Sequence, residues 1–520
     1  MAIGANVVWE IRTTATAANV NGGGFDPTSA GTDYSQQDAS QYNFADLAST
    51  NATTAGGATV TSASHNFVTA DEGNIINITA GTSWTVGRYK IVSTSANAAT
   101  LDRNCGSVAS ITGGTYRVGG ALSLANANDQ ATLTAIAAGN TAWIKSGTYQ
   151  LVVSLTSGTS GTSTKNTLLT GYTTTRGDTC NGTSRPVIAL DTATGTSSTT
   201  FPSYWRFTNI EISGTGVNNS GFISGAGSSF INCRLVNKGS VAALNGGANM
   251  KVINSEVYSN GGNGISATSD SVIHGCTIHG CGTGVALTST GNLVMNNIFF
   301  GFLTQAVSTS GADGYFVGNT FYGLEGKTAV GCTVSGLGGA ILNNIFYGLT
   351  TGISHSVANQ TGYFENFNTY FNNTTDVTNF TKGLDTIALD PTFTSVTNKT
   401  GSAATTLAFV LTDGAADFSA VVDNQTYCRL VGGTNAGYHK ITAHTGTTLT
   451  LDKSIGTTSG RTYQVILGKD FSVGTNMRAK GFPGDFTFLA TGYMDIGGVQ
   501  RKEAIEAVSP TVAFPFIGGF

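Results

Sequence analysis

A hydrophobic residue recurs about every 22 residues through the middle of the chain, a spacing typical of solenoid repeats. The recurring positions are Ile212, Leu235, Val257, Ile278, Phe299, Phe321, Phe346 and Phe371. Two residues before them lies a second column of Ile210, Cys233, Ser255, Cys276, Asn297, Asn319, Asn344 and Thr369. Residues two apart on a strand share a face, so both columns are expected to point inward. Gly, Ser, Thr and Asn fill the stretches between, as they do in turns. The pattern predicts an all-β fold, a right-handed parallel β-helix in which buried Asn side chains hydrogen-bond to turn backbone and to one another.

A second repeat flanks the first. The segments GT (81–82), GRYKI (87–91), TLDR (100–103) and YRV (116–118) return in the same order as GT (433–434), GYHKI (437–441), TLDK (450–453) and YQV (463–465). Both series alternate like strands and are separated by Gly-rich turns. We therefore predict two copies of one small β-module. Asp102 and Asp452 hold the same place in each copy and are expected to fix a turn rather than to perform chemistry.

These patterns divide the chain into five segments. They are an N-terminal arm over residues 1–56, a small β-module over 57–120, a capped β-helix over 121–393, a second module over 394–468 and a C-terminal tail over 469–520. Two short helices are predicted, over residues 36–48 and 127–138. The second would cover the first coil, because an uncapped solenoid exposes its core and its strand edges.

The composition excludes several classes of protein. Only 10% of the 520 residues are charged and the net charge is −4, so no attraction to nucleic acid or to an anionic membrane is expected. No signal peptide and no membrane-spanning segment is predicted, because the N-terminus lacks a basic region followed by an apolar run and no apolar run is long enough. Cys233 and Cys276 would lie two coils apart, roughly 10 Å by strand spacing, which is too far for a disulfide. We expect reduced packing cysteines and predict no cofactor.

Two outward-facing columns stand out on the predicted surface. The position before the core residue reads Glu211, Arg234 and Glu256 on three successive coils, which predicts a surface ladder of alternating charge. Arg234 as a catalytic base between two carboxylates is the alternative. The position after the core residue reads Tyr258, His279, Phe300, Tyr322 and Tyr347. Because an exposed apolar stripe usually marks an interface, we predict a contact between subunits. Cover by another segment of this chain and stacking against sugar rings are the alternatives.

Asp270 and Asp313 are the candidate catalytic pair. Each precedes a core position by eight residues, which places both in one loop column two coils apart, roughly 10 Å by strand spacing. Inverting glycosidases hold their two carboxyls about 6.5–9.5 Å apart, so the spacing is compatible with that chemistry. An Asp in a Ser/Gly turn also has an ordinary structural role. Both interpretations stay open at this point.

A cluster of His and Cys resembles a zinc site in spacing only. His274, Cys276, His279 and Cys281 fall within eight residues. Strand alternation is expected to point His274 and Cys276 inward and His279 outward, so the four side chains would not converge. We therefore predict no metal site.

Several segments resemble known proteins. WIKSGTY (143–149), TGYTTTRGD (170–178) and RPVI (185–188) resemble the opening coils of pectate-lyase-like right-handed β-helix proteins, and DPTF (390–393) and GYMDIGGVQ (492–500) resemble their closing segments. WEIRTT (9–14), NGGGF (21–25) and DYSQQD (33–38) are similar to β-helix proteins of tailed-phage virions. That superfamily contains lyases, hydrolases and inert structural proteins. Its lyases use clustered carboxylates, calcium and a basic residue, a set that we do not find in this sequence.

The resemblance implies a structural or adhesive protein of a tailed-phage virion. It would be a homotrimeric spike, fibre or decoration protein, made in the host cytoplasm, attached to other virion proteins through residues 1–56 and involved in binding the host surface. A host surface glycan is a further candidate partner. The alternative function is a polysaccharide depolymerase, a lyase or glycoside hydrolase, that cuts this glycan.

Overall fold

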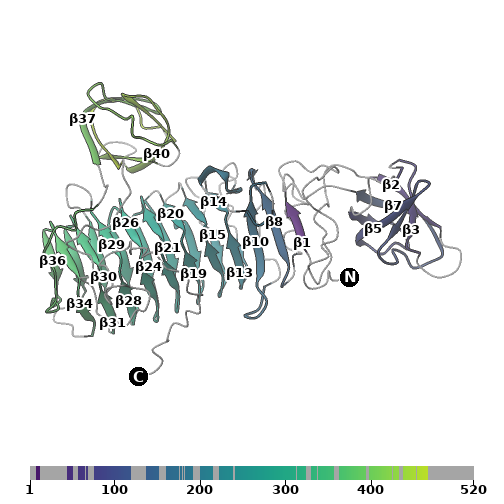
Figure 1. The fold of residues 1–520 in the computed structure, drawn as a ribbon, viewed down its shortest axis with the longest axis horizontal. Helices are drawn as coiled ribbons and strands as arrows, with labels where there is room; N and C mark the ends of the chain where they lie inside the picture. The colour runs from purple at the N-terminus through teal and green to yellow at the C-terminus, as the bar shows by residue number, and fades with distance from the viewer. Residues whose placement is uncertain are drawn as a thin grey trace, which may run out of the picture.

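The computed structural model describes residues 8–11, 44–50, 57–118, 136–150, 160–190, 200–393 and 398–466, apart from short gaps within these ranges. Three long parallel sheets form a solenoid, and two closed antiparallel barrels accompany it (Figure 1). The predicted all-β solenoid with two small β-modules is confirmed. The 3-10 turn η2 (Gly182–Ser184) is the only helix within the described ranges. None of the described helical segments has the length and apolarity needed to cross a membrane.

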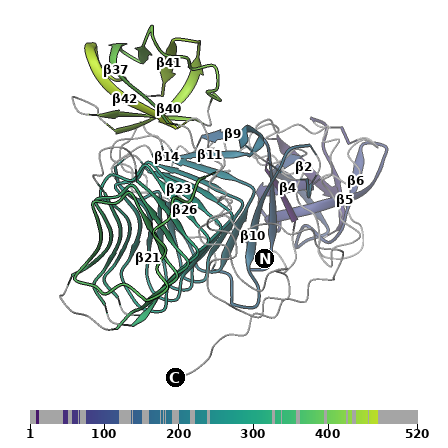
Figure 2. The ribbon, with the colours of Figure 1, turned by 60° about the vertical axis from the view of Figure 1, so that its left-hand side comes forward.

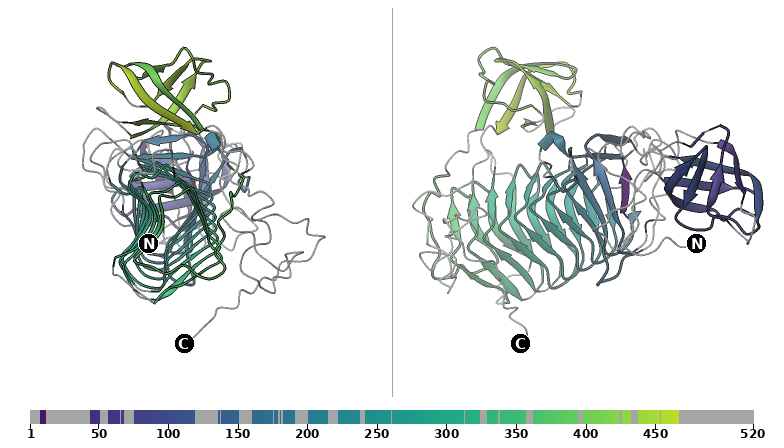
Figure 3. Two further views of the ribbon diagram at one scale, coloured as in Figure 1. Left: turned by 90° about the vertical axis from the view of Figure 1, so that its left-hand side faces the viewer. Right: turned by 45° about the vertical axis from the view of Figure 1, so that its right-hand side comes forward.

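Each coil contributes one strand to each of the three sheets, taken in turn. In spatial order, sheet 1 contains β1 (Val8–Ile11), β8 (Thr141–Lys145), β10 (Thr167–Tyr172), β13 (Trp205–Thr208), β16 (Ser229–Ile231), β19 (Lys251–Ile253), β22 (Val272–His274), β25 (Leu293–Met295), β28 (Gly314–Val317), β31 (Gly339–Leu342) and β34 (Phe364–Asn366). Sheet 2 contains β35 (Thr369–Phe371), β32 (Ile345–Tyr347), β29 (Thr320–Tyr322), β26 (Ile298–Phe300), β23 (Thr277–His279), β20 (Glu256–Ser259), β17 (Arg234–Asn237), β14 (Glu211–Gly214), β11 (Val187–Leu190) and β9 (Thr148–Gln150). Sheet 3 contains β12 (Thr200–Phe201), β15 (Phe222–Ser224), β18 (Leu244–Gly246), β21 (Asn263–Ala267), β24 (Thr283–Leu287), β27 (Gln305–Thr309), β30 (Val330–Val334), β33 (Thr351–His355) and β36 (Thr375–Thr378). Viewed along its axis, the solenoid shows these coils stacked on one another (Figure 3).

A left-handed residue turns the chain from sheet 1 into sheet 2 in each coil. The column of these corner residues, all with positive φ, is Asn209, Asn232, Asn254, Gly275, Asn296, Gly318, Asn343 and Phe367. Asn and Gly are the residues that adopt this conformation most readily, which explains why they dominate the column. The corner also breaks the in-out alternation between the two strands that it joins.

The predicted Asn ladder lies inside the solenoid, next to this corner. Asn297, Asn319 and Asn344 are fully buried, and each Nδ2 donates to the Oδ1 of the next member at 2.9–3.0 Å. Each Oδ1 also accepts the backbone N–H of the preceding coil at 2.8–2.9 Å. Because buried amides need partners, the ladder fixes the coils in register. Its last member is Asn368, one residue before the predicted Thr369.

The last coil is one residue shorter than the sequence pattern suggested. Asn344 and Asn368 are 24 residues apart, and Phe346 pairs with Tyr370, not with Phe371. Tyr370 is buried in the core and stacks on Phe346 at 5.1 Å, while Phe371 lies in the outward column beside Tyr347. The assignment of Phe371 to the core was therefore wrong, because a one-residue slip moves a side chain to the opposite face of a strand.

The N-terminal end of the solenoid is extended by a strand from the start of the chain. β1 pairs in parallel with β8, and Ile11 and Ile136 are both fully buried in the solenoid core. Most of the helix predicted over residues 127–138 lies outside the described residues. The helix predicted over residues 36–48 is contradicted at its end, because Phe44–Thr50 forms strand β2 of the first barrel. Pairing within the closed six-stranded barrel stabilises this strand, and local residue propensities do not reveal such long-range pairing.

The C-terminal end of the solenoid is capped by a buried carboxylate. Glu365 occupies an inward position of β34 and is 6% exposed. Its Oε1 accepts hydrogen bonds from Asn368 Nδ2 at 2.6 Å and from the Tyr370 hydroxyl at 2.9 Å, and its Oε2 accepts the N–H of Gly383. The carboxylate therefore ends the Asn ladder and holds the segment that covers the last coil, where Ile387 bridges to Thr369.

Replacing Glu365 with alanine is expected to lower the free energy of unfolding by about 3 kcal/mol, because two buried donors and the partly buried N–H of Gly383 lose their acceptor at once. Urea unfolding followed by circular dichroism measures the loss. Glu365→Gln is the matched control, since its amide oxygen keeps an acceptor in place and should retain much of the stability. Equal losses in the two variants would show that the carboxyl oxygens do not hold the cap.

The two barrels share one strand order. The first runs β2-β3-β6-β5-β4-β7, with β3 (Thr59–Thr61), β4 (Ile75–Ala80), β5 (Gly87–Ser95), β6 (Ala98–Leu101) and β7 (Ser110–Val118). The second runs β37-β38-β41-β40-β39-β42, with β37 (Asn398–Leu407), β38 (Val410–Thr412), β39 (Tyr427–Val431), β40 (Gly437–His444), β41 (Thr448–Leu451) and β42 (Thr458–Ile466). Each barrel encloses its own hydrophobic core. The first barrel includes β2, so it begins at Phe44, inside the segment predicted as an N-terminal arm over residues 1–56.

Asp102 and Asp452 make equivalent hydrogen bonds in the two barrels. The Oδ1 of Asp102 accepts the N–H of Lys90 at 3.1 Å, and that of Asp452 accepts the N–H of Lys440 at 3.0 Å. Each Asp N–H in turn donates to the carbonyl of the same lysine. These reciprocal bonds tie two neighbouring strands together, so both aspartates serve the barrel fold as predicted.

All seven cysteines are buried free thiols. Cys233 and Cys276 lie in the solenoid core and donate to backbone carbonyls. Burial raises the pKa of Cys233 to about 11 and that of Cys276 to about 12, so both stay protonated at neutral pH. They are packing residues, as the two-coil spacing predicted.

Candidate functional site

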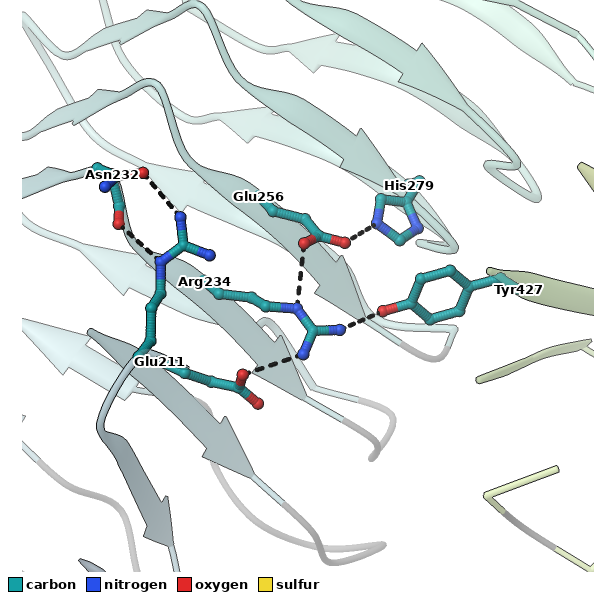
Figure 4. Close-up of polar contacts among 7 residues, drawn as sticks. Glu211, Asn232, Arg234, Glu256, His279 and Tyr427 are labelled. Carbon is teal, nitrogen blue, oxygen red and sulfur yellow. Dashed lines mark hydrogen bonds and ion pairs between the residues drawn. The ribbon is translucent and has the colours of Figure 1, made fainter. Parts of the chain in front are cut away.

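The outward charge ladder of sheet 2 forms as predicted. Glu211, Arg234 and Glu256 are in register on β14, β17 and β20. Arg234 Nη1 lies 3.0 Å from Glu211 Oε2, and Arg234 Nε lies 3.1 Å from Glu256 Oε2 (Figure 4). The side chain of Arg234 is only 8% exposed, compared with 13% for Glu211 and 28% for Glu256. A surface ion-pair row was expected, but the ladder is largely buried.

The second barrel covers this ladder. Tyr427, at the start of β39, accepts a hydrogen bond from Arg234 Nη2 at 2.6 Å and is 3% exposed. Figure 2 shows the barrel lying over sheet 2 of the solenoid. The guanidinium of Arg234 thus reaches two solenoid carboxylates and a barrel phenol at once. This network is a joint between two domains of the same chain.

The electrostatics of the joint keep Arg234 charged. Burial lowers the pKa of Arg234, but Tyr427, Glu256 and Glu211 raise it by more, so the net shift is upward. Burial and then the charge of Glu256 raise the pKa of Tyr427 above its ordinary value, so the phenol stays protonated. A guanidinium that is permanently protonated and bonded on every side cannot accept a proton. The geometry therefore argues against Arg234 as a catalytic base.

His279 links the charge ladder to the aromatic column. It is fully buried, and its Nε2 lies 2.9 Å from Glu256 Oε1. Its ring stacks on Phe300 with 4.9 Å between centroids and 1° between planes. Tyr427 packs against it edge-on at 4.5 Å and against Tyr258 at 4.9 Å. One barrel residue therefore contacts both outward columns of sheet 2.

The predicted aromatic stripe exists, but this chain itself covers much of it. The rings of Tyr258, His279, Phe300, Tyr322 and Tyr347 occupy one outward register on successive strands. Four of them are 7% exposed or less, and Tyr347 is partly buried. Tyr427 packs on the first part of the column, and Phe393 packs edge-on against Tyr322 and Tyr347 at 5.8 and 5.6 Å. The prediction of an exposed stripe available to another subunit is wrong, and intrachain cover was the correct alternative.

Tyr427 is the residue of this site that the sequence pattern did not reveal. A comparison of the two modules could have found it. Tyr427 pairs with Lys440 in the second barrel as Ile75 pairs with Lys90 in the first. The two modules match in strand order, so this alignment places a Tyr opposite an Ile, as one of several differences along the strand. The first module lacks the hydroxyl that Arg234 requires.

The candidate catalytic pair lies elsewhere, on the turns that precede sheet 1. Asp270 and Asp313 are both exposed and adopt left-handed backbone conformations, with φ of 54° and 56°. They lie two residues before Val272 and Tyr315, which share one register column, and Gly291 holds the same position before Leu293 on the intervening coil. The predicted loop column is therefore present. Asp tolerates the left-handed conformation better than most residues, which gives both a role in the turn.

The His–Cys cluster does not converge, although one orientation was predicted wrongly. Cys276 and Cys281 are buried in the solenoid core and His279 points outward. His274 also lies on the outer face, because Ile273 takes the inward position of β22. The left-handed corner at Gly275 shifts the alternation between His274 and Cys276. In the part of the chain that the structure describes, no three His, Cys, Asp or Glu side chains gather as metal ligands would.

The comparisons agree with this architecture. Residues 193–321 and 222–388 match the family model described as a right handed beta helix region. The matched residues span the coils from β12 to β36, so this part of the chain is a right-handed parallel β-helix of the kind predicted from the repeat. No curated protein matches the chain.

Solved structures match the chain at low sequence identity and low TM-score. The mannuronan C-5 epimerase AlgE6 A-module of Azotobacter vinelandii is 14% identical, with a TM-score of 0.34, and the match covers 48% of this chain and 89% of that one. Pectate lyase Pel9A is 12% identical, with a TM-score of 0.38 and coverage of 71% and 90%. Tailspike gp61 of Pseudomonas phage phi297 is 12% identical, with a TM-score of 0.21 and coverage of 82% and 81%. These neighbours include enzymes and a virion protein, so they do not choose between functions.

Proposed function

We propose that this protein is a structural or adhesive component of a tailed-phage virion, a homotrimeric β-helix spike, fibre or decoration protein. The observation that carries the proposal is the joint on sheet 2. The charged and aromatic columns that could have bound a substrate there hold the second barrel in place instead, through Arg234 and Tyr427. A surface that holds one domain against another makes the molecule rigid.

The start of the chain supports the virion assignment. Residues 9–14 are among the segments that resemble phage β-helix proteins, and β1, which includes residues 9–11, pairs with the first coil of the solenoid. Under this proposal the N-terminal residues attach the rod to other virion proteins, and the solenoid projects outward to contact the host surface.

Immunogold electron microscopy of purified virions tests the location. Antibodies raised against the full-length protein are expected to label intact particles at one structure, the tail tip or the capsid surface. Label that stays with host debris, and particles that remain unlabelled after mild disruption, would contradict a virion role. Adsorption of the purified protein to host cells then separates an adhesive part from a purely structural one.

Depolymerase activity is the second candidate function, and Asp270 and Asp313 are the observation that favours it. Both aspartates are exposed. The turn between them on the middle coil carries Gly291, which has no side chain. A glycan could therefore approach both acids along the edge of sheet 1.

A further inference from the structure

The outer face of sheet 1 is apolar over six to seven coils. Two neighbouring outward columns run along it in register. They comprise Val272, Leu293, Tyr315, Ala340 and Phe364 in one column and Ile231, Ile253, His274, Met295, Val317 and Leu342 in the other. Tyr315 is 44% exposed, Phe364 is 55% exposed and the remaining side chains are partly exposed. We call this surface the apolar face.

The apolar face carries no charge along its length. Burial lowers the pKa of His274 below its ordinary value, so its imidazole is neutral at neutral pH. Among the described residues, charged side chains lie beside this face at its edges, and Lys251 shares strand β19 with Ile253. Lys251 and Arg206 extend the first column beyond Val272, and Asp270 and Asp313 lie in the turns beside it. An apolar centre with a charged rim is the usual anatomy of a protein–protein interface.

The other two faces of the same coils are built differently. The outward positions of sheet 3 are mostly small and polar, and include Ser266, Ala286, Ser308, Thr333 and Ser354 on successive strands. The outer face of sheet 2 is apolar and charged, and the second barrel packs on it. Within one solenoid, the exposed face of sheet 3 is therefore polar, and the covered face of sheet 2 is rich in apolar residues. The apolar face of sheet 1 has the composition of a covered surface.

The area fits one interface between copies of this chain. Eleven partly exposed side chains present on the order of 500 Å² of apolar surface, within the range of about 300–600 Å² for the largest patch on a typical monomer, a patch that is often functional. A standard interface buries about 800 Å² per partner, of which roughly 57%, or about 450 Å², is apolar. The apolar face alone supplies this amount. Because its columns repeat at strand spacing, identical columns of parallel copies can meet at the same height about a symmetry axis.

We propose that the apolar face of sheet 1 is the surface through which copies of this chain associate. The inference rests on the proposed function and deepens it, because it names the surface through which the homotrimer assembles. The apolar face takes the role that was predicted for the aromatic column of sheet 2, which the second barrel covers. Its test is separate from that of the proposed function, since a virion location does not depend on which face makes the contact.

The experiment compares the mass of the full-length protein and two charged variants by light scattering after size-exclusion chromatography. Val317→Glu places a carboxylate in the centre of the apolar face. Ser308→Glu places the same group on the preceding strand of the chain, β27 of sheet 3. We expect the unmodified protein and Ser308→Glu to be oligomers, and Val317→Glu to have a dissociation constant raised at least tenfold. Unchanged circular dichroism would show that the variants fold.

Three results would overturn the proposal. The first is an unmodified protein that is monomeric at all concentrations, and the second is an oligomer that survives Val317→Glu. The third is a monomer in which Val317→Glu lowers the melting temperature and Ser308→Glu does not, which would show that residues of this same chain, such as 467–520, cover the face. If Val317→Glu fails to fold, Tyr315→Ser at a 44% exposed position provides the same comparison.

Discussion

Replacing Arg234 with alanine is expected to release the second barrel from the solenoid and to lower the free energy of unfolding by about 3 kcal/mol. The change removes the ion pairs that Arg234 makes with Glu211 and Glu256, and it removes the hydrogen bond from Arg234 to Tyr427. Breaking a buried pair costs about 3–5 kcal/mol because an uncompensated charge stays behind, and the 28% exposure of Glu256 places this case at the lower end. Chemical unfolding measures the loss.

Hydrogen exchange shows whether the loss is local to the joint. Amides of β39 and β17 should exchange faster in Arg234→Ala, while those inside the barrel core keep their protection. Arg206→Ala is the matched control, because Arg206 is an exposed arginine on β13 of the same solenoid and should change stability by less than about 0.5 kcal/mol. If the two variants were equally stable and β39 stayed protected, Arg234 would not hold the barrel.

Replacing Asn319 with alanine is expected to lower the free energy of unfolding by about 4 kcal/mol. Asn319 is fully buried, and its side chain makes four hydrogen bonds. Its Nδ2 donates to Val294 O and to Asn344 Oδ1, and its Oδ1 accepts from the backbone N–H and the Nδ2 of Asn297. An unpaired buried polar group costs about 1–3 kcal/mol, and this change leaves several of them together with a cavity. Urea unfolding measures the difference.

The same column of the solenoid provides the control. Cys276 lies two coils earlier and is equally buried, but its side chain only donates weakly to backbone carbonyls. Cys276→Ala is therefore expected to lower stability by about 1 kcal/mol. Similar losses for Asn319→Ala and Cys276→Ala would mean that volume, rather than the hydrogen-bonded ladder, sets the stability of the column.

The regular part of the fold could be predicted from the sequence because one coil repeats one pattern. Core residues such as Phe299 and Phe321 and the ladder residue Asn319 each follow from spacing alone. The pattern failed where local geometry departs from the mean coil. Phe371 was misplaced because the last coil is one residue shorter, and His274 was misplaced because the corner at Gly275 shifts the alternation.

The joint on sheet 2 could be predicted only in part. The ladder of Glu211, Arg234 and Glu256 follows from the repeat, since it depends on register between adjacent coils. Its burial depends on Tyr427, which is 193 residues away from Arg234 along the chain. No spacing rule connects residues so far apart. The exchange of Ile for Tyr is one of several differences between β4 and β39, and finding it required the barrels to be aligned strand by strand.

The most direct test of a structural rather than a catalytic protein is the release of sugar from the host's surface polymer. Purified full-length protein is incubated with capsule and lipopolysaccharide of the host, and new reducing ends and unsaturated uronates are measured against a heat-denatured sample. We predict no release above that background, together with adsorption of the protein to the cells. Release that Asp270→Asn abolishes would contradict the account and assign the exposed carboxylates to catalysis.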